Sequence, residues 1–116
     1  MKFLHVTIQT KAFEEEMKFY QEIVGLKIVN DLRPMGTEIV FFANAEGETC
    51  VEVINSPDAD ATVNQFRSIG FATDDVEALR ADLESKGLNP TPMISPNPHT
   101  KFFFVTDPAG VRVQFM

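Results

Sequence analysis

The sequence contains no tryptophan, one tyrosine and one cysteine among its 116 residues. A single cysteine cannot build the disulfide framework that stabilises many small secreted domains. No apolar stretch reaches the roughly 18 residues that indicate a transmembrane helix, and nothing resembles a signal peptide. We therefore expect a cytoplasmic protein that has no membrane partner.

Basic residues are also few, because 10 Lys and Arg stand against 17 Asp and Glu and the formal net charge is −7. Nucleic-acid affinity rests largely on basic side chains that neutralise phosphates, so this balance argues against a nucleic-acid partner. Phenylalanine, in contrast, occurs 11 times in a chain that is 44% hydrophobic. Rings without a polar atom suit a core or the wall of a cavity.

The first half of the chain predicts a strand, a helix and three more strands. Residues 2–9 alternate between apolar and polar side chains, which is typical of a half-buried strand. Apolar residues then recur at helical spacing from Phe13 to Val24, and Gly25 is placed to end the helix. Three segments with strand character follow: Leu26–Leu32, Glu38–Ala43 and Thr49–Asn55.

The second half predicts the same order of elements. A strand over Arg67–Thr73 precedes a helix over Val76–Ser85, for which Asp74 and Glu77 fit a capping box. The remaining segments are an edge strand weakened by two prolines, a loop, and a hairpin around a turn of aspartate, proline, alanine and glycine: Leu88–Ile94, Ser95–Thr100 and Phe102–Met116.

The two halves therefore form a tandem repeat. Gly25-Leu26 recurs as Gly87-Leu88, and the same offset carries Glu52 onto Gln114. We place the modules at residues 1–56 and 67–116, joined by a polar linker at 57–66. The predicted fold class is α+β, with two tandem βαβββ modules whose mixed sheets enclose a cavity.

This pattern resembles the vicinal-oxygen-chelate superfamily, which includes glyoxalases, bleomycin-resistance proteins and extradiol dioxygenases. The resemblance spans nearly the whole chain and is carried by LHVTIQT, KFYQEIVGLKIV, CVEVI, SIGFATDDVEALRADLESKGL and FFFVTDPAGVRVQFM. It implies paired βαβββ modules, commonly a homodimer, and a divalent metal held by one residue from each of four strands.

The family's four metal positions fall on residues of unequal strength as ligands. His5 and Glu52 match the first two positions, the third, usually a histidine, falls on Ser68, and the fourth, usually a glutamate, falls on Gln114. The resemblance thus implies His5, Glu52 and Gln114 as ligands in an incomplete site, since catalytic metals of this type typically have about three protein ligands. In a glyoxalase-like dimer, the first two residues of one chain would meet Ser68 and Gln114 of the other.

Each of these residues also has a plainer interpretation. His5 and Gln114 suit hydrogen-bonded or solvated positions at the rim of a sheet. Glu52 lies between Cys50 and Ile54 on its face, where a carboxylate loses solvation unless something meets it, so we expect a ligand or a catalytic base.

Further candidates for substrate contact are Arg33, Ser68, His99 and Phe102. Arg33 is able to pair with an anionic substrate, although single surface arginines are common. His99 lies in a proline-rich loop that suits either a lid or an exposed loop without a role. Phe102 belongs to a run of phenylalanines whose alternation sends some rings to the cavity or to a dimer interface.

Two function classes remain open. The first is a glyoxalase-like lyase or isomerase that acts on a carbonyl-containing small molecule, with Glu52 as the catalytic residue that moves a proton. The alternative is a metal-free binding protein of the bleomycin-resistance type, which suits the acidic charge because cationic ligands would be attracted.

Overall fold

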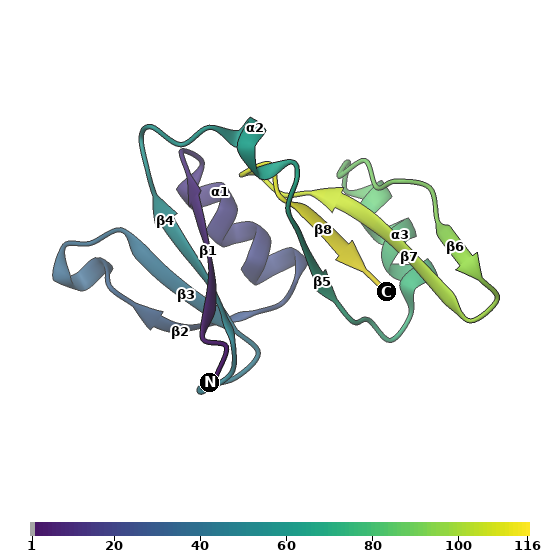
Figure 1. Ribbon diagram of the computed structural model, residues 1–116, viewed down its shortest axis with the longest axis horizontal. Helices are drawn as coiled ribbons and strands as arrows, with labels where there is room; N and C mark the ends of the chain where they lie inside the picture. The colour runs from purple at the N-terminus through teal and green to yellow at the C-terminus, as the bar shows by residue number, and fades with distance from the viewer. Residues whose placement is uncertain (1) are drawn as a thin grey trace. The chain divides into compact units, whose positions relative to one another are not determined.

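The computed structural model describes residues 2–116 and contains two four-stranded mixed sheets with a few helices (Figure 1). This architecture confirms the predicted α+β class. The chain divides into two compact units, the first ending at Ala61 and the second running from Thr62 to Met116. No helix in the described part of the chain is long and apolar enough to cross a membrane.

The first unit is a sheet in the order β1-β4-β3-β2 with a helix against one face (Figure 1). Its outer strand β1 is parallel to β4, and the other neighbours are antiparallel. The elements are β1 His5–Thr10, α1 Phe13–Lys18, η1 Phe19–Ile23, β2 Lys27–Asp31, η2 Arg33–Met35, β3 Ile39–Ala43 and β4 Cys50–Asn55. The predicted segments are present, with ends shifted by a few residues.

The first core lies between the helix and one face of this sheet. Val40, Phe42 and Val53 are completely buried, and the ring of Tyr20 lies 6.4 Å from that of Phe42. Because neighbouring residues of a strand point to opposite faces, Glu52 projects from the face that the helix does not cover.

The helix in this unit changes its winding halfway. Its α-helical part ends at Lys18, and Phe19–Ile23 continues as a π-helix before Gly25 ends the element at a φ of 82°. The prediction of a helix from Phe13 to Val24 therefore has the correct extent. The wider turn was not predicted, because a π segment leaves little signal in apolar spacing.

The second unit repeats this plan with the order β5-β8-β7-β6, and β5 is parallel to β8. Its elements are α2 Ala61–Asn64, β5 Ser68–Phe71, α3 Val76–Ser85, β6 Ile94–Asn97, β7 Thr100–Thr106 and β8 Arg112–Phe115. The short helix α2 spans the boundary between the units and lies entirely within residues 57–66, for which a linker is predicted.

Two details of the second unit correct the sequence predictions. The cap of α3 is Asp75, whose side chain accepts a hydrogen bond from the Ala78 amide at 2.9 Å, and not Asp74. The edge strand starts at Ile94, where the prediction ended it, and occupies part of the predicted loop. Prolines on both sides of Thr91 explain the shift, since they cannot donate to a ladder; Thr91 itself bonds to Phe104 of β7.

The predicted hairpin is confirmed. It joins β7 to β8 through a turn in which the buried Asp107 accepts hydrogen bonds from the amides of Ala109 and Val111 at 2.9 and 2.8 Å. Gly110 leaves the turn at a φ of 93°, which favours glycine.

Candidate functional site

The exposed face of the first sheet brings His5 and Glu52 together. Parallel pairing sets Thr7 directly beside Glu52, and His5 lies two residues before Thr7 on the same face of β1. The His5 Nε2 atom is 3.7 Å from Glu52 Oε2, and the Thr7 hydroxyl donates to Glu52 Oε1 at 3.1 Å. Two sequence candidates therefore meet on two adjacent strands.

An aromatic ring on the third strand completes this cluster. Phe41 of β3 is the neighbour of Glu52 on its other side, and its ring meets the His5 imidazole edge to face with 5.7 Å between centroids. The Glu52 side chain is only 13% exposed, whereas that of His5 is 41% exposed. Glu52 is thus a largely desolvated carboxylate that one hydroxyl orients, an arrangement suited to a base.

The donor atoms of His5 and Glu52 suit one half of a metal site. Two ligand atoms about 2.1 Å from a tetrahedral ion lie about 3.4 Å apart, close to the spacing of this pair. Within residues 2–116, however, no group of three or more His, Cys, Asp or Glu is able to hold an ion. The first unit alone supplies fewer than the three protein ligands typical of catalytic zinc.

The second sheet has different residues at the corresponding register positions. Gln114 lies between Gly70 and Phe104, as Glu52 lies between Thr7 and Phe41. Gly70 leaves room for the Gln114 amide, because a Cβ at that glycine would come within 3.3 Å of Gln114 Oε1.

Ser68 takes the register position in β5 that His5 holds in β1, and it is exposed. Ser68 and Gln114, which the resemblance implies as metal positions, lie on the neighbouring parallel strands β5 and β8.

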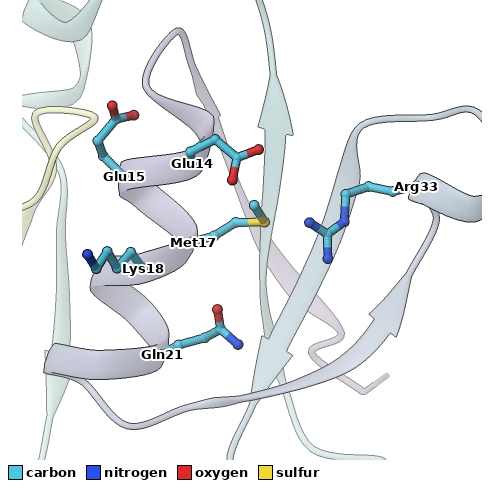
Figure 2. A pocket seen from close by; sticks show the side chains of 6 residues that line it. All are labelled: Glu14, Glu15, Met17, Lys18, Gln21 and Arg33. Carbon is cyan, nitrogen blue, oxygen red and sulfur yellow. The ribbon is translucent and has the colours of Figure 1, made fainter.

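Arg33 lies on the helix side of the first sheet, apart from the face of His5 and Glu52. It lines a groove of about 460 Å³ with residues of α1 and η1, namely Glu14, Glu15, Met17, Lys18 and Gln21 (Figure 2). Its guanidinium donates to both oxygens of Asp31, at 2.9 and 2.7 Å. These hydrogen bonds lower the pKa of Asp31 and raise the pKa of Arg33.

The other two candidates lie in the second unit. Phe102 is on β7, on the same face as Phe104, with 5.8 Å between ring centroids. His99 occupies the turn between β6 and β7, where its backbone amide donates to the Asn97 side chain. The described contacts give the His99 ring no partner in residues 2–116.

Sequence reasoning missed two contributors, Thr7 and Arg112. The alternation of β1 does place Thr7 on the face of His5. Its contact with Glu52, however, depends on the parallel register of β1 and β4, which connects segments far apart in the sequence. Arg112 lies with its guanidinium carbon 4.1 Å from the centroid of the Phe104 ring, a contact that again joins two strands.

Comparisons with known proteins agree with this fold. A sequence model described as the Glyoxalase/Bleomycin resistance protein/Dioxygenase superfamily matches residues 2–115. The chain is 23% identical over 130 residues to a lactoylglutathione lyase of Haemophilus influenzae, an alignment that covers 100% of this chain and 92% of the relative.

Two solved structures have the same fold at low sequence identity. TnmS3, an antibiotic binding protein from Streptomyces sp. CB03234, is 20% identical with a TM-score of 0.77, over 99% of this chain and 93% of the other. The trypanothione-dependent glyoxalase I of Leishmania major is 22% identical with a TM-score of 0.73, over 100% of this chain and 86% of the other.

Proposed function

Because the chain belongs to the Glyoxalase/Bleomycin resistance protein/Dioxygenase superfamily, we propose that it is a lyase or isomerase acting on a carbonyl-containing small molecule. The observation that carries this proposal is the pairing of His5 with Glu52, 3.7 Å apart on an exposed sheet face. A carboxylate and an imidazole side by side supply the base and the hydrogen-bond donor that proton transfer next to a carbonyl needs.

In this proposal Glu52 removes a proton from the carbon beside the carbonyl and returns it to a neighbouring atom. Thr7 holds Oε1, so Oε2, the oxygen near His5, takes the proton. His5 donates a hydrogen bond to the carbonyl oxygen, where negative charge develops as the proton leaves. The proton count is unchanged over the cycle, as an isomerisation requires.

A divalent metal would be held by His5 and Glu52. In a glyoxalase-like dimer, the family resemblance implies Gln114 of the other chain as the third ligand. When bound, the ion would supply Lewis-acid polarisation of the substrate oxygen in place of the hydrogen bond from His5. An imidazole, a carboxylate and an amide oxygen suit a hard or borderline ion such as Mn²⁺. Formation of a homodimer is a further prediction, which size-exclusion chromatography with light scattering tests.

The proposal is tested by proton exchange in lactoylglutathione, the compound named by the Haemophilus influenzae relative. The chain is incubated with it in D₂O, with Mn²⁺ and separately with EDTA, and loss of the lactoyl α-proton signal is followed by NMR. We expect Glu52→Gln to slow enzyme-dependent exchange by about 10² or more, because general-base catalysis contributes about 10²–10⁴.

Glu48→Gln is the matched control, because it removes the same charge from an exposed position shortly before β4. It should exchange at the wild-type rate. Equal rates in wild type and Glu52→Gln would contradict the role of Glu52, and no exchange above the protein-free rate would exclude proton abstraction from this compound.

A second function, binding without chemistry, is favoured by the aromatic surface of the second sheet, where Phe102 and Phe104 lie side by side on its exposed face. The Streptomyces structure is described as an antibiotic binding protein. This alternative predicts saturable ligand binding with no exchange under any metal condition, so the same NMR samples distinguish the two functions.

A further inference from the structure

Arg112 is an exposed arginine without a carboxylate partner in residues 2–116. Arg33 pairs with Asp31, Arg80 pairs with Glu84, and Arg67 donates to a backbone carbonyl. In a chain with a net charge of −7, a guanidinium that no acidic side chain has neutralised is a notable feature of the second sheet.

The guanidinium of Arg112 is positioned by an aromatic ring. Its central carbon lies 4.1 Å from the centroid of Phe104, a cation–π distance. A contact with the face of a ring uses the charge of the guanidinium and leaves the N–H donors at its edge for another group. The side chain is therefore held in place, and no residue described in the structure accepts a hydrogen bond from its guanidinium.

Hydroxyl groups flank Arg112 on both neighbouring strands. Ser68 of β5 and Thr106 of β7 lie at its register position, and both are exposed. A hydroxyl on each side of a guanidinium offers additional donors to the oxygens of a bound anion.

The same face becomes apolar towards β6. Phe104 is followed by Phe102, and Ile94 of β6 lies at the register position of Phe102 with 37% of its surface exposed. One end of the exposed face thus offers a cation with hydroxyls, and the other end offers two rings and an aliphatic side chain.

We propose that Arg112 recognises the carboxylate of an otherwise apolar ligand, an organic acid whose aromatic or aliphatic tail lies along Phe104 and Phe102 on the exposed face of the second sheet. This ligand site goes beyond the proposed function, and its carboxylate contact is measured separately. A carboxylate fits better than a phosphate, because one guanidinium matches one negative charge and a dianion would meet the acidic surface of the chain.

Binding of two probes that differ only at the anion tests the inference. The probes are 2-oxo-4-phenylbutanoate and 4-phenylbutan-2-one, in which a methyl group replaces the carboxylate, with inorganic phosphate as a third titrant. Calorimetry gives each dissociation constant, and the Arg112 Nε–H signal in NMR reports contact at the guanidinium.

We expect Arg112→Gln to raise the dissociation constant of the acid by about tenfold or more, since a charge-assisted bidentate contact is lost. The dissociation constant of the ketone should be unchanged. The affinity of Arg112→Lys for the acid should lie between those of wild type and Arg112→Gln, because a point charge replaces the planar guanidinium. Lys101→Gln is the matched control: it also removes one positive charge from β7–β8, but Lys101 faces α3 and pairs with Glu77 at 2.6 Å.

The inference is overturned if no binding of the acid is measured, or if wild type and Arg112→Gln bind the acid equally. It is also overturned if Lys101→Gln weakens binding of the acid as much as Arg112→Gln does, or if phosphate binds more tightly than the acid. Failure of the proposed function has a different signature. In that case the acid binds through Arg112, but lactoylglutathione shows no exchange that depends on Glu52.

Discussion

At the scale of single residues, the proposed role of Glu52 depends on its low exposure to water. A carboxylate that is 13% exposed loses much of its hydration, and one hydroxyl at 3.1 Å replaces part of it. Such a group is costly for stability, and carboxylates in such settings are frequent at functional sites. His5, three times as exposed, is the more solvent-accessible member of the pair.

The ion pair of Asp31 with Arg33 gives a pH-dependent prediction. Since Arg33 lowers the folded-state pKa of Asp31, the pair's contribution to stability is fully present above the unfolded-state pKa of about 3.9. It is lost as the pH falls through the lower folded-state pKa. Arg33→Gln should therefore raise the Asp31 pKa toward its ordinary value, as measured by a ¹³C NMR titration of the carboxyl carbon.

Lys101→Gln is the control for this titration, because that lysine pairs with Glu77 in the other unit. It should leave the Asp31 titration as in wild type. An Asp31 pKa that stays low in Arg33→Gln would show that the guanidinium is not its cause.

At the same scale, the sequence identified some residues of the candidate sites and missed others for a definite reason. His5 and Glu52 were found because alternation and a family resemblance mark them within their own strands. Thr7 and Arg112 act through neighbours on other strands, and strand register is a property of the folded sheet that no local pattern contains.

At the scale of elements, the start of α3 distinguishes two adjacent aspartates. Asp75 accepts a hydrogen bond from the Ala78 amide, whereas the sequence pattern had favoured Asp74. Asp75→Ala should lower the free energy of unfolding by about 1 kcal/mol in urea denaturation, the usual cost of losing a helix cap. Asp74→Ala should change it by less than about 0.5 kcal/mol, as for most surface substitutions.

The reverse ranking of these two variants would place the cap at Asp74. The cap was misplaced by one residue because both aspartates precede the same apolar stripe, and only the backbone conformation decides which side chain reaches the free amides. The edge strand was misplaced for a similar reason. Prolines exclude backbone hydrogen bonds at their own positions, but they do not determine the residue at which strand pairing resumes.

At the scale of the whole molecule, the repeated order of elements was predictable because each half carries its own turn and helix signals. In the structure, the pairing register of the strands is repeated as well. Gln114 lies between Gly70 and Phe104 as Glu52 lies between Thr7 and Phe41. Two similar sheets thus present different chemistry, a carboxylate with an imidazole on one and an arginine with aromatic rings on the other.

We propose that the function resides on the sheet face of His5 and Glu52 and not in the groove beside α1. Titration of the ¹⁵N- and ¹³C-labelled chain with lactoylglutathione, followed by NMR, tests this most directly. We predict shifted signals for His5 and Thr7, with those of Lys18 and Gln21 in the groove unchanged. Shifts confined to Lys18, Gln21 and Arg33, with His5 unaffected, would place the ligand in the groove and contradict a site at His5 and Glu52.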